Sequence, residues 1–215
     1  MSLIVHLHPL SSYCWKALIA LYENGTPFEP RIIDFYDPDS AAAFRGLWPI
    51  AKMPVLEDTA RGRVVPEGSI VIEYLQAFYP GPVEFVPADP EAALEVRLAD
   101  RLFDLHVQDF LQRIVGDRIR PADAKDPFGL ADAHARLKTS YGVIEDRMRT
   151  RTWAAGDTFS MADCAAAPAL YYADKVSPIE GPATRAYLER LKDRPSFARV
   201  LKEAEPYFAM FPSEP

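Results

Sequence analysis

The chain has 215 residues, of which 49% are hydrophobic and 26% charged, enough for one large core or two smaller ones. Its net charge of −7 argues against a general nucleic-acid-binding surface, which needs a basic face. Two cysteines, Cys14 and Cys164, are too few for a disulfide framework and fit a reducing compartment. Since there is no secretory signal pattern and no apolar run near the ~20 residues of a membrane span, we expect a cytoplasmic protein without a membrane partner.

The first eighty residues alternate between strand and helix signals. Residues 11–24 carry apolar side chains at helical spacing and end at Gly25, a residue typical of the position after a helix. These signals predict a small α/β sheet in which a crossover helix joins parallel strands and a hairpin adds an antiparallel edge. The expected strands are residues 4–7, 28–35, 53–56 and 63–65, and the expected helices are 11–24 and 69–78, with a short helix or irregular segment at 41–47.

After a segment rich in proline, residues 79–90, the strand signals largely disappear. Asp89-Pro90 and Asp126-Pro127 each pair an N-cap residue with a proline at the first helical position, and Ser160 with Asp163 indicates a capping box. We therefore expect two domains, 1–80 and 90–215, joined by a linker at 81–89. The helices expected in the second domain are a long one from 90 past 114, then 126–150, one opening at 160, 182–192 and 196–208.

Two serines, Ser11 and Ser12, stand where the first helix is expected to begin. A serine at this position is often no more than a helix N-cap. The same position also favours an anion, because free backbone N–H groups and the positive end of the helix dipole meet there. A thiolate is such an anion.

Two further motifs precede secondary-structure elements, Lys52-Met53-Pro54 before a strand and Glu67-Gly68-Ser69 before a helix. Each has an ordinary interpretation, as a turn and as a helix start. In a thioredoxin-like sheet, however, the proline is cis, and the backbone before it pairs with a bound peptide as with an added strand. Glu67 suits an α-amino group, and the amides of the helix start suit a carboxylate. With the serines, these motifs favour a small zwitterionic peptide that carries a thiol.

The order of these motifs, followed by Gly156-Asp157-Thr158-Phe159-Ser160-Met161-Ala162-Asp163, resembles that of a cytosolic glutathione transferase along the whole chain. The resemblance implies an N-terminal thioredoxin-like domain that binds glutathione as co-substrate and a C-terminal helical bundle domain that holds a small electrophile. It also implies a homodimer and no metal. The serine-using classes (zeta, tau and similar bacterial enzymes) have a basic residue five positions after the serine, as Lys16 follows Ser11 here. Ser11 is thereby the implied catalytic residue, and the implied glutathione contacts are Ser11, Ser12, Lys52, Met53, Glu67, Gly68 and Ser69.

The chain departs from the family pattern at several positions. Gly68 replaces the usual serine and offers only its amide, so either Ser69 compensates or glutathione binds more weakly. The segment 48–51 (Trp-Pro-Ile-Ala) replaces the common Asn-Pro-x-Gly. His6 and His8 occupy the positions where other classes place a catalytic tyrosine, which excludes that mechanism. The candidates for the second-substrate pocket are Tyr13, Phe103, His106 and Phe110.

Activation of the glutathione thiol by Ser11 is energetically sufficient. Lowering a thiol pKa of ~8.5 by two units requires roughly 2.7 kcal/mol. A hydrogen bond from the hydroxyl to the charged sulfur supplies ~1.5–3 kcal/mol. The helix N-terminus adds ~0.3–1 kcal/mol. No general base is required for attack on an apolar electrophile.

Other functions remain open at this stage. A glutathione-dependent isomerase, dehalogenase or ether-cleaving enzyme would use the same thiolate. Zeta-type isomerases, however, usually have arginine where this chain has Leu10. A disulfide-reducing enzyme would use Cys14 to form a mixed disulfide with glutathione. The third class is a non-catalytic glutathione-binding scaffold.

Overall fold

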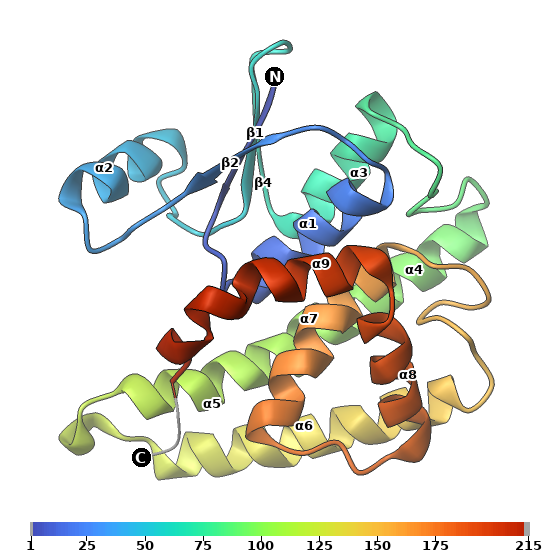
Figure 1. The fold of residues 1–215 in the computed structure, drawn as a ribbon. Helices are drawn as coiled ribbons and strands as arrows, with labels where there is room; N and C mark the ends of the chain where they lie inside the picture. Colours follow the sequence, from blue (N-terminus) through green and yellow to red (C-terminus); the bar gives the residue numbers. More distant parts are fainter. Residues whose placement is uncertain (1, 213–215) are drawn as a thin grey trace.

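The computed structural model describes residues 2–212. A four-stranded sheet has the order β2-β1-β3-β4, in which β1 pairs parallel with β2 and antiparallel with β3. The helix α1 makes the crossover, and Gly62, with φ 61°, lies in the turn between β3 and β4. This is the predicted thioredoxin-like arrangement (Figure 1). Its elements are β1 (Leu3–Leu7), α1 (Ser12–Glu23), β2 (Glu29–Ile32), α2 (Pro38–Leu47), β3 (Val55–Asp58), β4 (Arg63–Pro66) and α3 (Gly68–Phe78).

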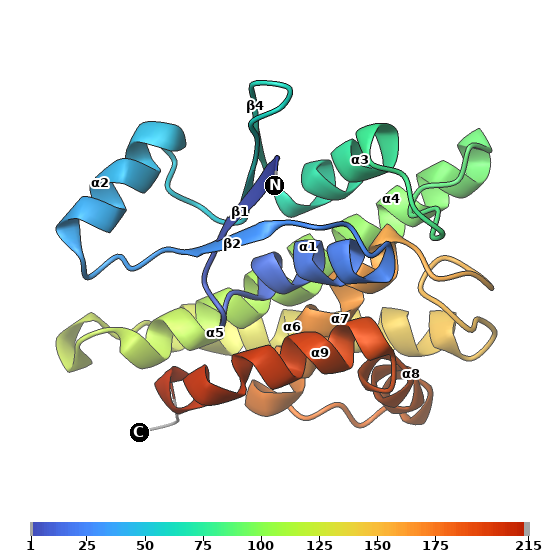
Figure 2. The same ribbon diagram turned by 45° about the horizontal axis from the view of Figure 1, so that its top comes forward.

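Different helices pack on the two faces of this sheet. On one face α1 and α3 pack together, within a large core that continues into the second half of the chain. On the other face Phe44 of α2 packs with Ile33 and Val55 in a small separate cluster. Figures 1 and 2 show α2 standing apart from α1 and α3 across the sheet. The main contacts of the second half of the chain are with α1, on the side of the sheet that α1 and α3 cover.

The second half is all helical, which confirms the predicted fold class. The predicted start signals form as expected, since Asp89 accepts a hydrogen bond from the Ala92 amide at 2.8 Å and Ser160 forms a capping box with Asp163. The central helix is α7, which packs against α1 and α4. No helix within residues 2–212 has the length and apolar character needed to cross a membrane. The helices are α4 (Pro90–Phe103), α5 (Asp109–Ile119), α6 (Pro127–Met148), α7 (Met161–Val176), α8 (Pro182–Lys192) and α9 (Pro195–Ala204), with 3-10 turns at Ala122–Ala124 and Glu205–Met210.

The long helix predicted after the linker contains a π-helical turn, Asp104–Gln108, between α4 and α5. Such a turn holds one residue more than an α-helical turn and rotates the faces of the helix that follows. Three large leucines of this segment, Leu94, Leu98 and Leu105, lie exposed on the surface. The core side of the same helix instead carries Ala93, Val96, Ala99, Phe103 and Val107.

Candidate functional site

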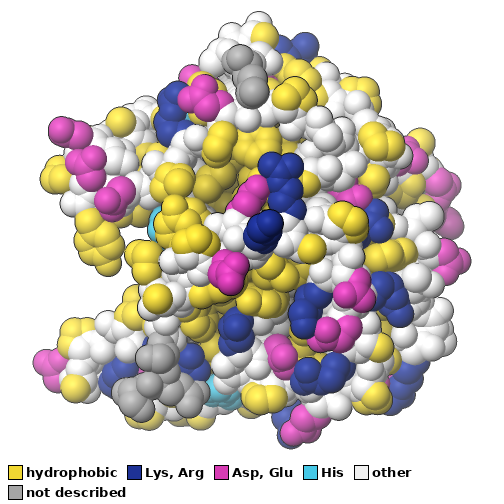
Figure 3. Space-filling model, in the orientation of Figure 1, with side chains coloured by type: hydrophobic (Ala, Val, Ile, Leu, Met, Phe, Trp, Pro, Cys, Tyr) yellow, Lys and Arg dark blue, Asp and Glu magenta, His cyan; other side chains and the backbone are white. Residues whose placement is uncertain are grey.

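A cavity of about 780 Å³ lies between the start of α1 and the helical half, a volume within the usual range of small-molecule sites. Figure 3 shows the surface hollowed between the regions of α2 and α5, with hydrophobic side chains on its walls. One wall is formed by His8, Leu10, Ser11, Ser12, Tyr13, Phe35, Ala51, Lys52, Met53, Pro54, Glu67 and Gly68. The other is formed by Arg101, Asp104, Leu105, Gln108, Asp109, Leu111, Gln112, Val115, Tyr172, Phe211 and Pro212.

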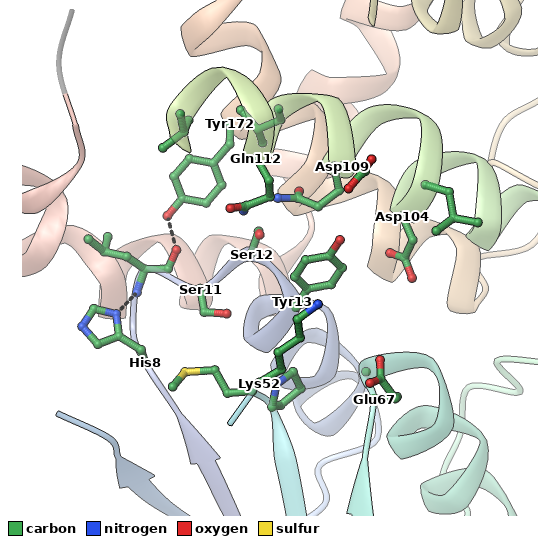
Figure 4. A pocket seen from close by; sticks show the side chains of 18 of the residues that line it. His8, Ser11, Ser12, Tyr13, Lys52, Glu67, Asp104, Asp109, Gln112 and Tyr172 are labelled. Atoms are coloured by element: carbon green, nitrogen blue, oxygen red, sulfur yellow. Dashed lines mark hydrogen bonds between the residues drawn. The ribbon is translucent and has the colours of Figure 1, made fainter. Parts of the chain in front are cut away.

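Ser11 is the N-cap residue of α1, and its Oγ accepts a hydrogen bond from the Cys14 amide at 3.3 Å. Because the oxygen is the acceptor in that bond, the hydroxyl proton remains available for an anion in the cavity. The Ser11 amide donates to the His8 carbonyl at 2.9 Å, which fixes the turn after β1. Figure 4 shows Ser11, Ser12 and Tyr13 together at the start of α1.

The surroundings of Tyr13 and His8, two titratable residues close to Ser11, favour their neutral forms. Burial and the charge of Asp104 raise the pKa of the Tyr13 phenol, so it stays protonated. Burial lowers the pKa of His8, whose Nδ1 accepts a hydrogen bond from the Leu10 amide.

Cys14 lies one turn further along α1, fully buried in the core. Burial raises the pKa of its thiol to about 12. A thiol of this kind is protonated at neutral pH, and a protonated, enclosed thiol is a poor nucleophile. The structure thus gives no support to a mixed disulfide with glutathione at Cys14.

The backbone beside the cavity has two unusual features. The Met53–Pro54 peptide bond is cis, as expected for a thioredoxin-like sheet. Ala51 and Glu67 have φ values of 56° and 71°, the two positive values of non-glycine residues within 2–212. Left-handed backbone costs such residues ~1–2 kcal/mol, and strain of this kind concentrates at functional sites. Ala51 occupies the position of the glycine in the common Asn-Pro-x-Gly motif. The positive φ at this position explains why the motif has a glycine there.

Lys52 and Glu67 line the cavity with opposite charges, and the two side chains are not paired with each other. Within residues 2–212 neither side chain has a salt bridge or hydrogen bond. Gly68 begins α3 beside them, and a Cβ there would lie 3.4 Å from Lys16 Cδ and from the Tyr13 carbonyl, an ordinary contact. Glycine is therefore not required by space. The cation, the carboxylate and the first-turn amides of α3 together suit a zwitterionic ligand.

The Ser69 side chain lies away from this ligand surface, inside a buried polar cluster. Its hydroxyl accepts a hydrogen bond from Lys16 Nζ and donates one to Asp100 Oδ2, both at 2.8 Å. Lys16 Nζ also lies 2.6 Å from Asp100 Oδ1 and 2.7 Å from Asp104 Oδ2. Burial raises the pKa of Asp104, and the Lys16 ammonium opposes that effect. The cluster joins α1 and α3 to α4, so the Ser69 hydroxyl is not free to replace the one missing at Gly68.

Among the four side chains expected in the second-substrate pocket, only Tyr13 lines the cavity. Phe103 and Phe110 are buried in the core, and His106 is exposed outside the cavity. The two phenyl rings pack inward because the core buries more apolar surface than the mixed wall of the cavity. The cavity side instead carries mostly polar residues at helical spacing, a pattern that the sequence does contain: Arg101, Asp104, Leu105, Gln108 and Gln112. Within residues 2–212 no cluster of His, Cys, Asp or Glu side chains could hold a metal ion.

Comparison with known proteins gives the following similarities. Residues 6–83 match the family model for the N-terminal domain of glutathione S-transferase, and residues 126–190 match that for its C-terminal domain. The chain is 28% identical to FtsZ-localized protein A of Caulobacter vibrioides over 95% of this chain and 93% of the relative. A glutathione S-transferase from Methylobacterium radiotolerans, solved in complex with glutathione sulfonate, is 28% identical with a TM-score of 0.81, over 92% of this chain and 93% of that one. The structure of FzlA from C. crescentus is 26% identical with a TM-score of 0.79, over 94% and 92%.

Proposed function

Since the chain belongs to the cytosolic glutathione transferase superfamily, we propose that its Ser11 hydroxyl stabilises the glutathione thiolate for attack on an electrophile. The observation that carries this proposal is the placement of Ser11. It caps α1 with its oxygen, faces the cavity, and keeps a hydroxyl proton to donate. The domains in this proposal are residues 1–80 for glutathione and 90–215 for the second substrate, with the linker at 81–89.

The free charges of the cavity support one orientation of glutathione. Glu67 would receive the α-ammonium group, and the first-turn amides of α3, including that of Gly68, would receive the adjacent carboxylate. Lys52 would pair with the carboxylate at the glycine end. The Met53 backbone, beside the cis proline, would pair with the cysteinyl residue, which directs its sulfur toward Ser11.

Glutathione binding tests this proposal directly. A calorimetric titration is expected to show one site per chain, and Glu67→Gln is expected to weaken binding about tenfold, since a hydrogen bond to a charged group contributes ~1.5 kcal/mol or more. Glu84→Gln, in the exposed linker, is the matched control and should bind as the wild type does. Turnover is then measured with an aryl halide, benzyl chloride and an enal. A titration without binding heat at several temperatures would contradict the proposal.

A non-catalytic binding role is the second candidate. It is favoured by the similarity to FtsZ-localized protein A, whose name records a location at another protein rather than a reaction. Glutathione binding without turnover of any electrophile in the panel would support this candidate over the first.

We also propose that the protein forms a homodimer through an exposed apolar face on α3 and α4. Leu94 and Leu98 are 66% and 58% exposed and flank Arg97. Arg97 pairs with Glu73 of α3 at 2.7 Å, which places the leucines beside the neighbouring helix, where Ile70 and Phe78 are also exposed. Apolar side chains gathered in this way usually mark an interface.

Leu98→Glu tests the dimer, because it would bury two unpaired carboxylates at a twofold interface. We expect the wild type to have the mass of a dimer by light scattering and Leu98→Glu to have that of a monomer. Phe128→Glu is the control, since Phe128 is 87% exposed at the start of α6, away from this face. A wild-type monomer, or a Leu98→Glu dimer, would refute the assignment.

A further inference from the structure

The short segment 8–11 between β1 and α1 carries Ser11, and hydrogen bonds fix its backbone. The Leu10 amide donates to His8 Nδ1 at 3.2 Å, and the Ser11 amide donates to the His8 carbonyl at 2.9 Å. The Trp15 indole donates to the Pro9 carbonyl at 2.5 Å. These three bonds come from the segment itself and from α1, and none of them involves the Leu10 carbonyl.

The Leu10 carbonyl has its partner in the other half of the chain. It accepts a hydrogen bond from the Tyr172 hydroxyl at 3.0 Å, although the two residues are 162 positions apart. Tyr172 belongs to α7, and Figure 4 shows it directed toward the segment that leads to Ser11. Burial raises the pKa of the Tyr172 phenol, so the hydroxyl keeps its proton and acts as the donor. The start of α1 is thereby bonded to the central helix of the helical half.

The ring of Tyr172 is itself held in place by two other rings. Its centroid lies 4.7 Å from that of Trp15, and it stacks on Phe211 at 5.2 Å with an angle of 21° between the ring planes. The residue is 3% exposed. Because close packing restricts this ring, its hydroxyl is a fixed point for the Leu10 carbonyl.

The peptide group between Leu10 and Ser11 is therefore held at both ends. Tyr172 holds its carbonyl, and the His8 carbonyl holds its N–H. This group is planar and leads directly to the Ser11 Cα, so a rotation of the group would move the Ser11 hydroxyl. Hydrogen bonds weaken steeply with distance and angle, and a displacement of ~1 Å can lower a rate about 100-fold.

We propose that Tyr172 is a positioning residue, which holds the Leu10–Ser11 peptide group so that the Ser11 hydroxyl lies within hydrogen-bond distance of the glutathione sulfur. This inference rests on the proposed function, which assigns the thiolate to Ser11. Tyr172 acts through Ser11, because its own hydroxyl proton is engaged with the Leu10 carbonyl. Activation of glutathione in the N-terminal half thus depends on a side chain of the helical half.

Tyr172→Phe tests the inference, since it removes the hydroxyl and keeps the ring. The pKa of the bound thiol is expected to rise by about one, from ~6.5 to ~7.5, while the Kd of glutathione changes little. At about pH 6.5 this change lowers the thiolate fraction from about a half to about a tenth, so kcat should fall about fivefold there. Above about pH 9 both thiols are ionised, and the two rates should converge. Ultraviolet absorbance of the thiolate and the pH dependence of initial rates measure these effects.

Tyr141→Phe is the matched control. The Tyr141 hydroxyl donates to the Ser177 carbonyl at 2.8 Å, a comparable bond of the helical half that lies outside the cavity. This variant should lose similar stability and keep the thiol pKa of the wild type. The double variant Ser11→Ala with Tyr172→Phe should have the thiol pKa of Ser11→Ala alone, because the hydroxyl that Tyr172 positions is already absent.

An unchanged thiol pKa in Tyr172→Phe would overturn the inference. An equal rise in Tyr141→Phe, or a further rise in the double variant, would overturn it too. Ser11→Ala separates this failure from that of the proposed function. If Ser11→Ala raises the thiol pKa and Tyr172→Phe does not, only the positioning role is wrong. If Ser11→Ala leaves the pKa unchanged, or the wild type does not bind glutathione, both are wrong.

Discussion

Replacing Ser11 with alanine is expected to lower kcat roughly 10- to 100-fold while the Kd of glutathione changes little, because a hydrogen bond to a charged partner contributes ~1.5–3 kcal/mol. In the proposed mechanism the hydroxyl acts on the sulfur, whereas the charged contacts of Lys52 and Glu67 hold the rest of the peptide. The pKa of the bound thiol should rise toward the free value of ~8.5. Thiolate absorbance in the ultraviolet as a function of pH measures that shift, and initial rates measure kcat.

Ser11→Ala also removes a helix cap, and the controls must separate the resulting loss of stability from the loss of turnover. Ser11 caps α1 through its bond with the Cys14 amide, and loss of an N-cap to alanine costs ~0.5–2 kcal/mol. Glycine at the same position costs only a few tenths, so Ser11→Gly should lose the same turnover with less loss of stability. Ser12→Ala tests the neighbouring hydroxyl. A large loss of kcat in Ser12→Ala together with a normal Ser11→Ala would transfer the role to Ser12.

Lys16→Met is expected to destabilise the protein by about 3–5 kcal/mol, because it leaves buried carboxylates without their cation. The Lys16 side chain is 1% exposed, and its ammonium contacts Ser69 on α3, Asp100 on α4 and Asp104 in the π-helical turn. These contacts join α1 and α3 to α4, so the two halves should lose stability together. Urea unfolding followed by fluorescence and circular dichroism measures the free energy of unfolding and shows whether both signals change together.

A second ion pair between α3 and α4 is the matched control. Arg97 and Glu73 lie 2.7 Å apart, but both are partly exposed, so Arg97→Met should cost no more than ~1 kcal/mol. The loss of stability in Lys16→Met should also depend on pH. Burial already raises the pKa of Asp104, and loss of Lys16 raises it further, so the deficit of Lys16→Met is full at neutral pH and shrinks as the pH falls toward ~4. A deficit that is equal for both variants, or that grows in acid, would contradict the role of the cluster.

The features of the structure that could be predicted from the sequence are those specified by residues close together in the chain. Helix starts such as Asp89-Pro90 and Ser160 with Asp163 are specified by residues three or four positions apart, and they form as expected. The motifs around Ser11, Met53 and Glu67 lie at the ends of strands of one sheet, so their meeting at one cavity follows from the topology.

The second wall of the cavity has no such local cause. Which side of the helix faces the cavity depends on the packing against α7 and on the π-helical turn, and neither leaves a clear mark in hydrophobic spacing. Aromatic character therefore pointed to Phe103 and Phe110, which pack in the core, and gave no signal for Gln108, which lines the cavity. The spacing of Lys16 from Ser11 is a local signal, but its partners Asp100 on α4 and Asp104 in the π-helical turn are 84 and 88 residues away, beyond any local pattern.

The π-helical turn makes the composition of this wall depend on the length of the chain. One inserted residue rotates the rest of a helix by about 100° about its axis, so the side chains that α5 presents to the cavity are set by the length of the chain between Asp104 and Gln108 as much as by their identity. A change of one residue in that stretch would alter the cavity row of α5 and would also turn its buried Phe110, Leu111 and Ile114 away from the core. The composition of this wall is therefore tied to the packing of the helical half, whereas Ser11 and the proposed glutathione surface, on the other side of the cavity, are not tied to it in this way.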